Sequence, residues 1–216
     1  MRKAIGVPSV CQSEGGRVSR AEQRERTRLA LVREARRLFA AEGYGAVGLS
    51  QIVAAAGVTK GALYHHFEGK AELFRAVLEE VQQEVGAGVA RQADAQEGAW
   101  EQFVAGCHAF LTVSTAPDVR RIMLIDGPAV LGWAEWRAMD EAASARHLEE
   151  AVAGLVEAGI VASQPTGPIT RLLSGAMNEA ALWLAESGDP ADLAATQRAL
   201  TGLLESLREV PVHGRS

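Results

Sequence analysis

The sequence predicts an all-α protein of about nine helices, with three short N-terminal helices in helix-turn-helix spacing followed by a larger helical domain. Aromatic residues make up only 5% of the chain while Ala and Leu are abundant, which favours helix over sheet. Apolar residues recur three and four positions apart through most of the chain, as on one face of a helix. No segment shows the alternating pattern of a strand, and no internal repeat is visible.

The composition is that of a globular protein. The 216 residues are 48% hydrophobic and 23% charged, which is enough to bury a sizeable core. Two cysteines, Cys11 and Cys107, cannot cross-link a fold of this size, so a disulfide-rich secreted protein is excluded. No apolar run approaches the roughly 20 residues that span a bilayer, and no signal peptide opens the chain. We expect a soluble, cytoplasmic protein with no membrane partner.

The charge is unevenly distributed along the chain. Residues 1–75 hold 13 basic and 7 acidic side chains, whereas residues 76–216 hold 9 basic and 20 acidic ones. The net charges are therefore +6 and −11. This division indicates a basic module that meets a polyanion, although two ordinary solvated faces would give the same counts.

The N-terminal region divides into a tail and three helices. Residues 1–18 lack periodicity and predict a disordered tail. A helix is expected over 20–42, where apolar residues lie on one face and glycines follow. A short helix over 49–56 and another from Thr59 to about His65 complete a domain over 19–68, with Thr59 as N-cap of the third helix.

The remaining helices form a predicted second domain over 69–210, followed by a tail over 211–216. A long helix starts near Lys70, a loop occupies 91–98, and a helix runs through Trp100 and Leu111. A short helix lies around 121–125, ended by Gly127-Pro128, and one long helix spans 132–158. The last helices cover 169–186, with Pro168 in its first turn, and 191–208, after the Asp189-Pro190 cap.

The third helix has a composition suited to a DNA groove. In a helix-turn-helix the second helix of the pair enters the major groove with its N-terminus first. Thr59 and Lys60 supply hydrogen-bond donors there, while Gly61 and Ala62 leave room for close approach. Leu63 provides the anchor to the domain core.

The run AGVTKGALYHHF over 56–67, followed by Lys70, Leu73 and Phe74, resembles the DNA-binding domain of the TetR family of bacterial regulators. The likeness covers about residues 24–81. The stretch LIDGPAVLGW over 124–133 resembles a signature of one TetR subgroup. The resemblance implies a helical ligand-binding and dimerisation domain after the DNA-binding domain.

The resemblance also implies roles for individual residues. Thr59, Lys60 and Gly61 meet bases or phosphates, Tyr64 and His65 project from the same helix, and Lys70 binds phosphate at the start of the next helix. Ser50 and Gln51 lie on the preceding helix and touch the groove or backbone. Where the family commonly has a Thr/Ser pair this chain has Val47-Gly48, so Ser50 is an alternative cap for that helix.

Several of these residues also have a purely structural interpretation. Tyr64 could be a half-buried core aromatic. Adjacent histidines on a helix point about 100° apart, so His65 and His66 rarely share a metal ion, and we expect none. The arginines before residue 30 form either a solvated helix face or an arm that tracks phosphate: Arg17, Arg20, Arg24, Arg26 and Arg28.

An enzyme is disfavoured. The glycines at 43, 45 and 48 match a dinucleotide fingerprint, but they follow a predicted helix instead of a strand. The chain shows no nucleophile elbow and no Cys/His zinc spacing, so no cofactor is expected. Cys107 lies on an apolar helix face and is interpreted as a small buried hydrophobe.

The second domain is a candidate sensor. All four tryptophans lie in it, and large apolar side chains beside His108, Arg121, Asp126 and Asn178 suit a pocket for an apolar or amphipathic molecule, although core packing explains many of them. The candidate ligand-binding residues are Trp100, Phe103, Cys107, Phe110, Met123, Trp133, Trp136 and Met177.

The last two helices, about 169–186 and 191–208, are rich in Leu and Ala and would form a four-helix dimer interface, as the resemblance implies. A two-fold dimer reads a palindrome. The expected function is a ligand-responsive, dimeric transcriptional repressor released from a palindromic DNA operator by a small-molecule effector. The alternative is a constitutive DNA-binding regulator whose second domain only dimerises.

Overall fold

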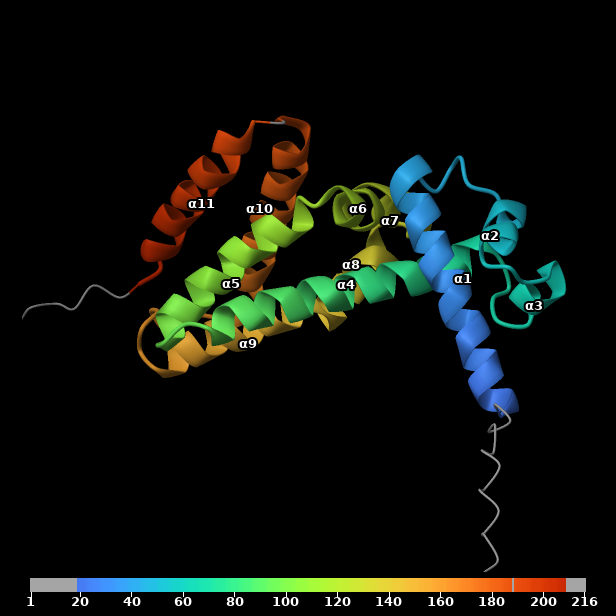
Figure 1. Cartoon of the computed structure of the whole chain (residues 1–216). Helices are drawn as coiled ribbons and strands as arrows, with labels where there is room; N and C mark the ends of the chain where they lie inside the picture. Colours follow the sequence, from blue (N-terminus) through green and yellow to red (C-terminus); the bar gives the residue numbers. More distant parts are fainter. Residues whose placement is uncertain (1–18, 188, 209–216) are drawn as a thin grey trace, which may run out of the picture.

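The computed structural model describes residues 19–187 and 189–208, and these are almost entirely helical (Figure 1). The all-α prediction is confirmed, since the only strand-like pairing within these ranges is one isolated bridge between Val161 and Arg208. No helix in the described part of the chain is long and apolar enough to cross a membrane. The two predicted tails, together with Cys11 and Arg17, lie outside the described residues.

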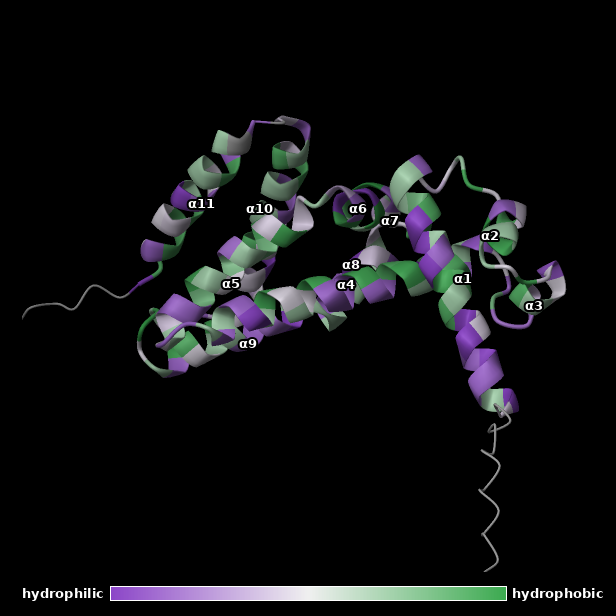
Figure 2. Cartoon of the chain, viewed as in Figure 1, coloured by the Kyte–Doolittle hydropathy of each residue, from purple (hydrophilic) through white to green (hydrophobic). Residues whose placement is uncertain are grey.

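The N-terminal helices begin and end close to where the sequence places them: α1 Arg20–Glu42, α2 Leu49–Ala55 and α3 Lys60–Tyr64. A capping box starts α1, because the Ser19 hydroxyl accepts from the Glu22 N–H while the Glu22 carboxylate accepts from the Ser19 N–H. The first turns of α1 are mostly hydrophilic, and its buried apolar residues begin only at Leu31, in the second half of the helix (Figure 2). That second half is what packs into the core, through Leu31, Val32, Ala35, Leu38 and Phe39.

Helix α4, Lys70–Asp94, joins the N-terminal helices to the rest of the molecule (Figure 1). Near its start Phe74 meets Phe39 and Tyr44, with ring centroids 5.5 and 5.1 Å apart. The loop predicted over 91–98 is wrong for its first half, because α4 continues to Asp94. Gly106 of α5, Ala99–Ser114, lets that helix pack closely against Val89 and keeps the last turns of α4 in place.

Three short elements follow without a break: α6 Pro117–Arg120, the π-helical η1 Arg121–Asp126 and α7 Gly127–Leu131. The prediction that Gly127-Pro128 ends a helix is wrong, because Pro128 lies in the first turn of α7, where its missing N–H leaves no bond unmade. Gly127 permits a close contact, since a Cβ there would lie 2.8 Å from Trp136 Cδ1. The Trp136 indole N–H donates to the Met123 carbonyl of η1 at 2.7 Å.

The single helix predicted over 132–158 is also wrong. Ala143, with φ −112° and ψ −106°, separates α8 Trp133–Ala142 from α9 Ser144–Glu157. This break allows α8 to pack beside α7 while α9 runs along α4 (Figure 1). Helix α10, Thr166–Ser187, starts two residues before Pro168, whereas α11, Pro190–Glu205, has the predicted Asp189 cap, whose side chain accepts from the Ala191 N–H at 2.8 Å.

One continuous core runs from α1 to α11. The short helices α2 and α3 lie at one end of the molecule, and α11 lies at the other (Figure 1). Arg36 helps to fix α1 on this body, because its guanidinium reaches Glu84 at 2.6 Å on α4 and Asp118 at 3.2 Å on α6. The fold thus presents α3 at the end opposite α11.

Candidate nucleic-acid interface and effector cavity

The leading turn of α3 is exposed and capped. Thr59, Lys60 and Gly61 are all exposed, and the Thr59 hydroxyl accepts from the Ala62 N–H at 3.1 Å, which confirms the predicted N-cap. Leu63, with no exposed surface, fixes the helix to the core from its opposite side. The free N–H groups and the positive end of the helix dipole therefore face outward, as binding to an anionic backbone requires.

The other candidate DNA-binding residues of α2 and α3 also lie on the surface. Tyr64 is 51% exposed, so the core-aromatic interpretation is wrong, and His65 and Ser50 are exposed as well. Ser50 does not cap α2, because the N-cap is Gly48 and no side chain bonds there. The Gln51 amide is exposed and donates to the Glu42 carboxylate at 2.8 Å, which fixes α2 against the end of α1.

Lys70 differs from the other candidates because it is half-buried. Its ammonium lies 4.1 Å from the centroid of the Tyr44 ring. Burial lowers the pKa of Lys70, and the Asp126 carboxylate opposes that shift. Lys70, in the first turn of α4, therefore also stabilises the place where α4 meets the α1–α2 loop and η1.

A groove of about 420 Å³ separates α1 from α3. Its lining residues are Gln23, Arg24, Thr27, Ala62, His65 and His66. Sequence reasoning did not single out Gln23 and Thr27, although their four-residue spacing on α1 is the signal that places them on one face. Arg20, Arg24 and Arg26 are exposed on the same helix, so the basic charge of α1 continues the surface of α3.

His66 gives this groove a pH-dependent component. Burial and the neighbouring Arg24 and Arg28 lower the pKa of His66 below its ordinary value of 6.5. The unfolded state then binds more protons than the folded state at mildly acidic pH, so stability falls as the pH decreases through and below about 6.5. No group of three or more metal-ligating side chains occurs in the described residues.

We expect His66→Gln to flatten the pH dependence of the melting temperature between about pH 5 and 7. The measurement is a thermal melt of wild type and variant across that range, with His147→Gln, on α9, as the control. An unchanged slope in the His66 variant would contradict the assignment.

Two residues expected in a ligand pocket instead join η1 to the end of α1 and the loop after it. The Asp126 carboxylate accepts from the Tyr44 N–H at 2.9 Å, and the Arg121 guanidinium donates to the Glu42 carbonyl at 3.3 Å. An ion pair at 3.6 Å connects Arg121 with Asp126. Segment η1 therefore holds the end of α1 and the loop that leads to α2.

The other two polar candidates, His108 and Asn178, also have structural contacts elsewhere. His108 contacts the Gln197 carbonyl and the Thr201 hydroxyl of α11, at 3.1 and 2.8 Å, because α5 and α11 pack together. Asn178 lies in a separate surface hollow beside Trp133. None of these four polar groups lines the cavity formed by Phe103 and Cys107.

A cavity of about 370 Å³ lies between α4, α5, α9 and α10. Four of the candidate ligand-binding residues line it: Phe103, Cys107, Phe110 and Met177. Burial raises the pKa of the Cys107 thiol to about 12, so Cys107 is an uncharged wall of the cavity. Sequence reasoning missed the contributions of Val89 and Ala93 on α4 and of Ala151 on α9, because helical periodicity shows which face is apolar but not which faces meet around a void.

The other four candidates do not line this cavity. Trp100 donates to Glu205 and packs under Arg208, and the buried Met123 accepts the Trp136 indole bond through its carbonyl. Trp133 and Trp136 line the separate hollow between α8 and α10. Trp100, Met123 and Trp136 are buried in helix packing, whereas Trp133 is 68% exposed, and composition alone could not separate these roles from pocket lining.

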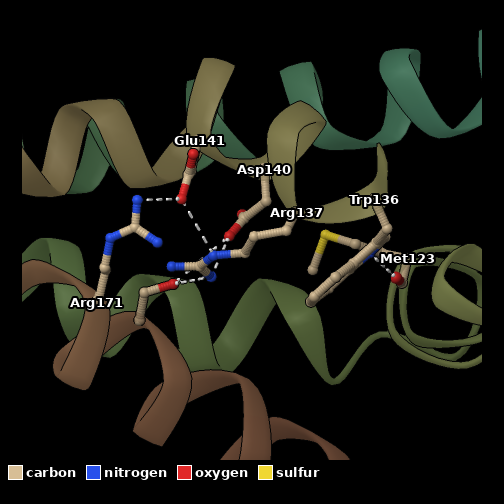
Figure 3. Close-up of polar contacts among 7 residues, drawn as sticks. Met123, Trp136, Arg137, Asp140, Glu141 and Arg171 are labelled. Atoms are coloured by element: carbon tan, nitrogen blue, oxygen red, sulfur yellow. Dashed lines mark hydrogen bonds and ion pairs between the residues drawn. The ribbon is translucent and has the colours of Figure 1, made fainter. Parts of the chain in front are cut away.

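A polar cluster joins α8 to α10 beside this cavity (Figure 3). The Arg137 guanidinium donates to the Asp140 carboxylate and to the Ser174 hydroxyl, each at 3.0 Å, and Glu141 joins Arg137 to Arg171. Asp140 and Ser174 also line the cavity, and Trp136, one helical turn before Asp140, contacts η1. The cavity wall is therefore connected through α8 to the junction that holds α1.

Two family models match this chain. Residues 31–77 match the model described as bacterial regulatory proteins, tetR family, and residues 100–207 match the tetracyclin repressor-like C-terminal domain. A crystal structure of a TetR-family regulator from Pectobacterium atrosepticum is 34% identical, covers 89% of this chain and 99% of its own, and superposes with a TM-score of 0.75.

Similar curated proteins match over shorter segments. The HTH-type transcriptional regulator SrpR of Pseudomonas putida is 45% identical over 58 residues, which are 27% of each chain. The transposon Tn10 TetC protein of Escherichia coli is 31% identical over 105 residues, 49% of this chain and 53% of that protein. The chain thus spans about a quarter to a half of these relatives. Together with the two family models and the 34% identical structure, the exposed helix-turn-helix and the helical body establish that this chain belongs to the TetR family of transcriptional regulators and is not an enzyme.

Proposed function

We propose that the chain is a dimeric repressor that binds a palindromic operator and leaves it when a small apolar or amphipathic effector enters the cavity between α4, α5, α9 and α10. The observation that carries the proposal is the exposed, capped leading turn of α3, which bears Thr59, Lys60 and Gly61 on a helix anchored by Leu63. A turn of this size and composition fits the major groove, where small residues allow close approach.

The proposed DNA contacts extend beyond that turn. Tyr64 at the end of α3 and its C-cap His65 complete the contacts of that helix, and Ser50 and Gln51 of α2 are exposed as well. Lys70 reaches phosphate only at the edge of the site, because its ammonium already contacts Tyr44. The groove beside α3 adds Arg24 of α1 as a further phosphate contact, since its charge has no ion-pair partner among the described residues.

The dimer is proposed to form through α10 and α11. Three large apolar side chains on these helices are exposed, with 70% of Leu172, 49% of Trp183 and 59% of Leu203 accessible. Small exposed residues, including Gly175, Ala176, Ala199 and Gly202, stand beside them. Such a surface is costly in water, and a second copy packed as a four-helix bundle would cover it. A two-fold axis there would present two α3 helices about 34 Å apart, or at a multiple-turn spacing.

Effector control follows from the contacts that join the cavity to the DNA-binding helices. An occupant between α9 and α10 would displace Asp140 and Ser174, and α8 would carry that shift through Trp136 to η1. Because η1 holds the Glu42 carbonyl and the Tyr44 N–H, its movement would turn α1 and change the spacing of the two α3 helices. A cavity of this volume is within the about 300–1,000 Å³ typical of small-molecule sites.

The operator interface is tested with Lys60→Ala. A duplex is first selected by the purified protein from randomised double-stranded oligonucleotides and then titrated over a range of salt concentrations. Loss of one phosphate contact in each half of the dimer is expected to weaken binding on the order of tenfold and to reduce the salt slope by about 2. Arg91→Ala, which removes an exposed charge near the far end of α4, is the matched control and should leave both quantities unchanged.

Unaltered affinity and salt slope for Lys60→Ala would count against α3 as the reading helix. A purified protein that ignores every duplex even in dilute buffer would contradict DNA binding altogether. Effector control is tested on the same duplex, since occupation of the cavity should release the protein while leaving it folded.

A further inference from the structure

A second cavity continues the first one along α4. It has a volume of about 600 Å³ and lies between α4 and the end of α8 with the start of α9. Ala90 and His147 line both cavities, so the two meet at these residues. The first cavity extends from there toward α5 and α10, whereas the second follows α4 back toward Arg75.

Gln82 is the unusual residue of this second cavity. It is only 2% exposed, and its amide nitrogen has no hydrogen-bond partner among the described residues. It stands on the buried face of α4 between Leu78 and Val85, where an apolar residue would pack without this cost. A buried amide donor without an acceptor destabilises the folded protein by roughly 1–3 kcal/mol. A ligand that supplies an acceptor there would remove this penalty and would bind more tightly for that reason.

The charges around the cavity select the kind of acceptor. Arg75 pairs with Glu135 and Arg146 lies 3.8 Å from Glu150, so both guanidinium groups of this cavity already have a carboxylate beside them. Glu79 lines the same cavity and forms no ion pair within residues 19–187 and 189–208, which disfavours a carboxylate. An ammonium group carries only donors and cannot satisfy the Gln82 amide N–H. An uncharged oxygen, as in a ketone, ester or alcohol, accepts a hydrogen bond from the Gln82 amide and is not repelled by the Glu79 carboxylate.

We propose that the effector is an elongated amphipathic molecule with an uncharged oxygen at its polar end. Its apolar body fills the first cavity beside Phe103, Phe110 and Met177, and its oxygen accepts a hydrogen bond from the Gln82 amide in the second. Gln82 and Ala90 are eight residues apart on one helix, so the molecule must extend beyond about 12 Å. This assignment rests on the proposed function, because it names the effector class of that same cavity.

The experiment compares three probes that share a long alkyl chain: 2-undecanone, undecanoate and undecylammonium. Each is titrated calorimetrically into the full-length protein without DNA. The wild type is expected to bind the ketone more tightly than either ion. Gln82→Leu should weaken ketone binding by roughly three- to tenfold, the worth of a neutral hydrogen bond, and leave the undecylammonium affinity unchanged.

Gln83→Leu is the matched control, because Gln83 lines the same cavity from an exposed position and should not alter ketone binding. If the Gln82→Leu protein does not fold, Gln82→Met provides the second reading, since it keeps a similar length, removes the amide donors and should weaken ketone binding to the same extent. Equal loss of all three probes in the Gln82 variants, or tighter binding of undecanoate than ketone by wild type, would overturn the proposal.

The binding experiment tests the ligand class and the operator experiment tests the proposed function, so a negative result in one does not decide the other. Ketone binding that depends on Gln82 but leaves the selected duplex bound would support the ligand class and contradict release as the function. An operator complex that dissociates with another compound while the ketone fails to bind would overturn the ligand class alone.

Discussion

Phe74→Ala is expected to lower the free energy of unfolding by about 3–5 kcal/mol, which is a large part of the stability of a domain of this size. Phe74 has no exposed surface and makes edge contacts with both Phe39 and Tyr44. Truncation would leave a cavity where α1, the α1–α2 loop and α4 meet, and these aromatic contacts cannot be replaced by local movement.

The measurement is urea unfolding at one fixed protein concentration, because dimerisation would otherwise alter the apparent stability. Leu29→Ala is the control, since Leu29 is 52% exposed on α1 and its truncation should cost less than about 0.5 kcal/mol. Equal unfolding midpoints for the Phe74 variant and wild type would show that the aromatic cluster does not stabilise this junction.

Gly43→Ala is expected to destabilise the protein by about 1–3 kcal/mol and to weaken operator binding as well. Gly43 ends α1 with φ 83° and ψ 156°, a backbone region open almost only to glycine. A Cβ there would lie 1.9 Å from the Arg121 guanidinium, which would have to leave the Glu42 carbonyl. The substitution therefore adds backbone strain and breaks one of the contacts through which η1 holds α1.

Gly45→Ala is the control that separates the strain and the lost Arg121 contact of Gly43→Ala from the effect of any Gly→Ala change in this loop. Gly45 lies two residues away, has no positive φ, and has no atom within 4 Å of an added Cβ. It should be neutral or slightly stabilising, by up to about 1 kcal/mol. The two variants are compared by thermal melts and by titration of the selected duplex. If Gly43→Ala behaves like Gly45→Ala in both assays, the junction is not strained and does not orient α1.

The three helices of the N-terminal region, α1 to α3, were largely predictable because their signals are local. The glycines at 43 and 57, the Thr59 cap and the apolar face of α1 fix where α1, α2 and α3 begin and end to within about a residue. The one local signal that failed is the cap of α2, where Gly48 stands without a side-chain bond and Ser50 remains on the surface. Within this domain, helix ends depend on neighbours three or four residues apart, and a sequence shows those neighbours directly.

The C-terminal domain was harder to predict because its breaks and contacts are not local. No Gly or Pro lies between Trp133 and Ala153, yet the chain turns at Ala143, and α8 packs mainly beside α7 while α9 packs mainly beside α10. Trp100 and Phe103 are three residues apart on one helix, but Trp100 packs beneath Arg208 while Phe103 lines the cavity. Periodicity assigns both to an apolar face and cannot distinguish core from void.

The sequence by itself determined the all-α class, the family and the small polar residues at the start of α3, because these depend on residue type and on short spacings along one helix. Only the tertiary structure decided which apolar side chains surround the cavity, that Arg121 and Asp126 hold the end of α1, and that the amide of Gln82 lacks a partner. The physical reason is that each of these features joins side chains from separate helices, and their distances are set by how the helices pack.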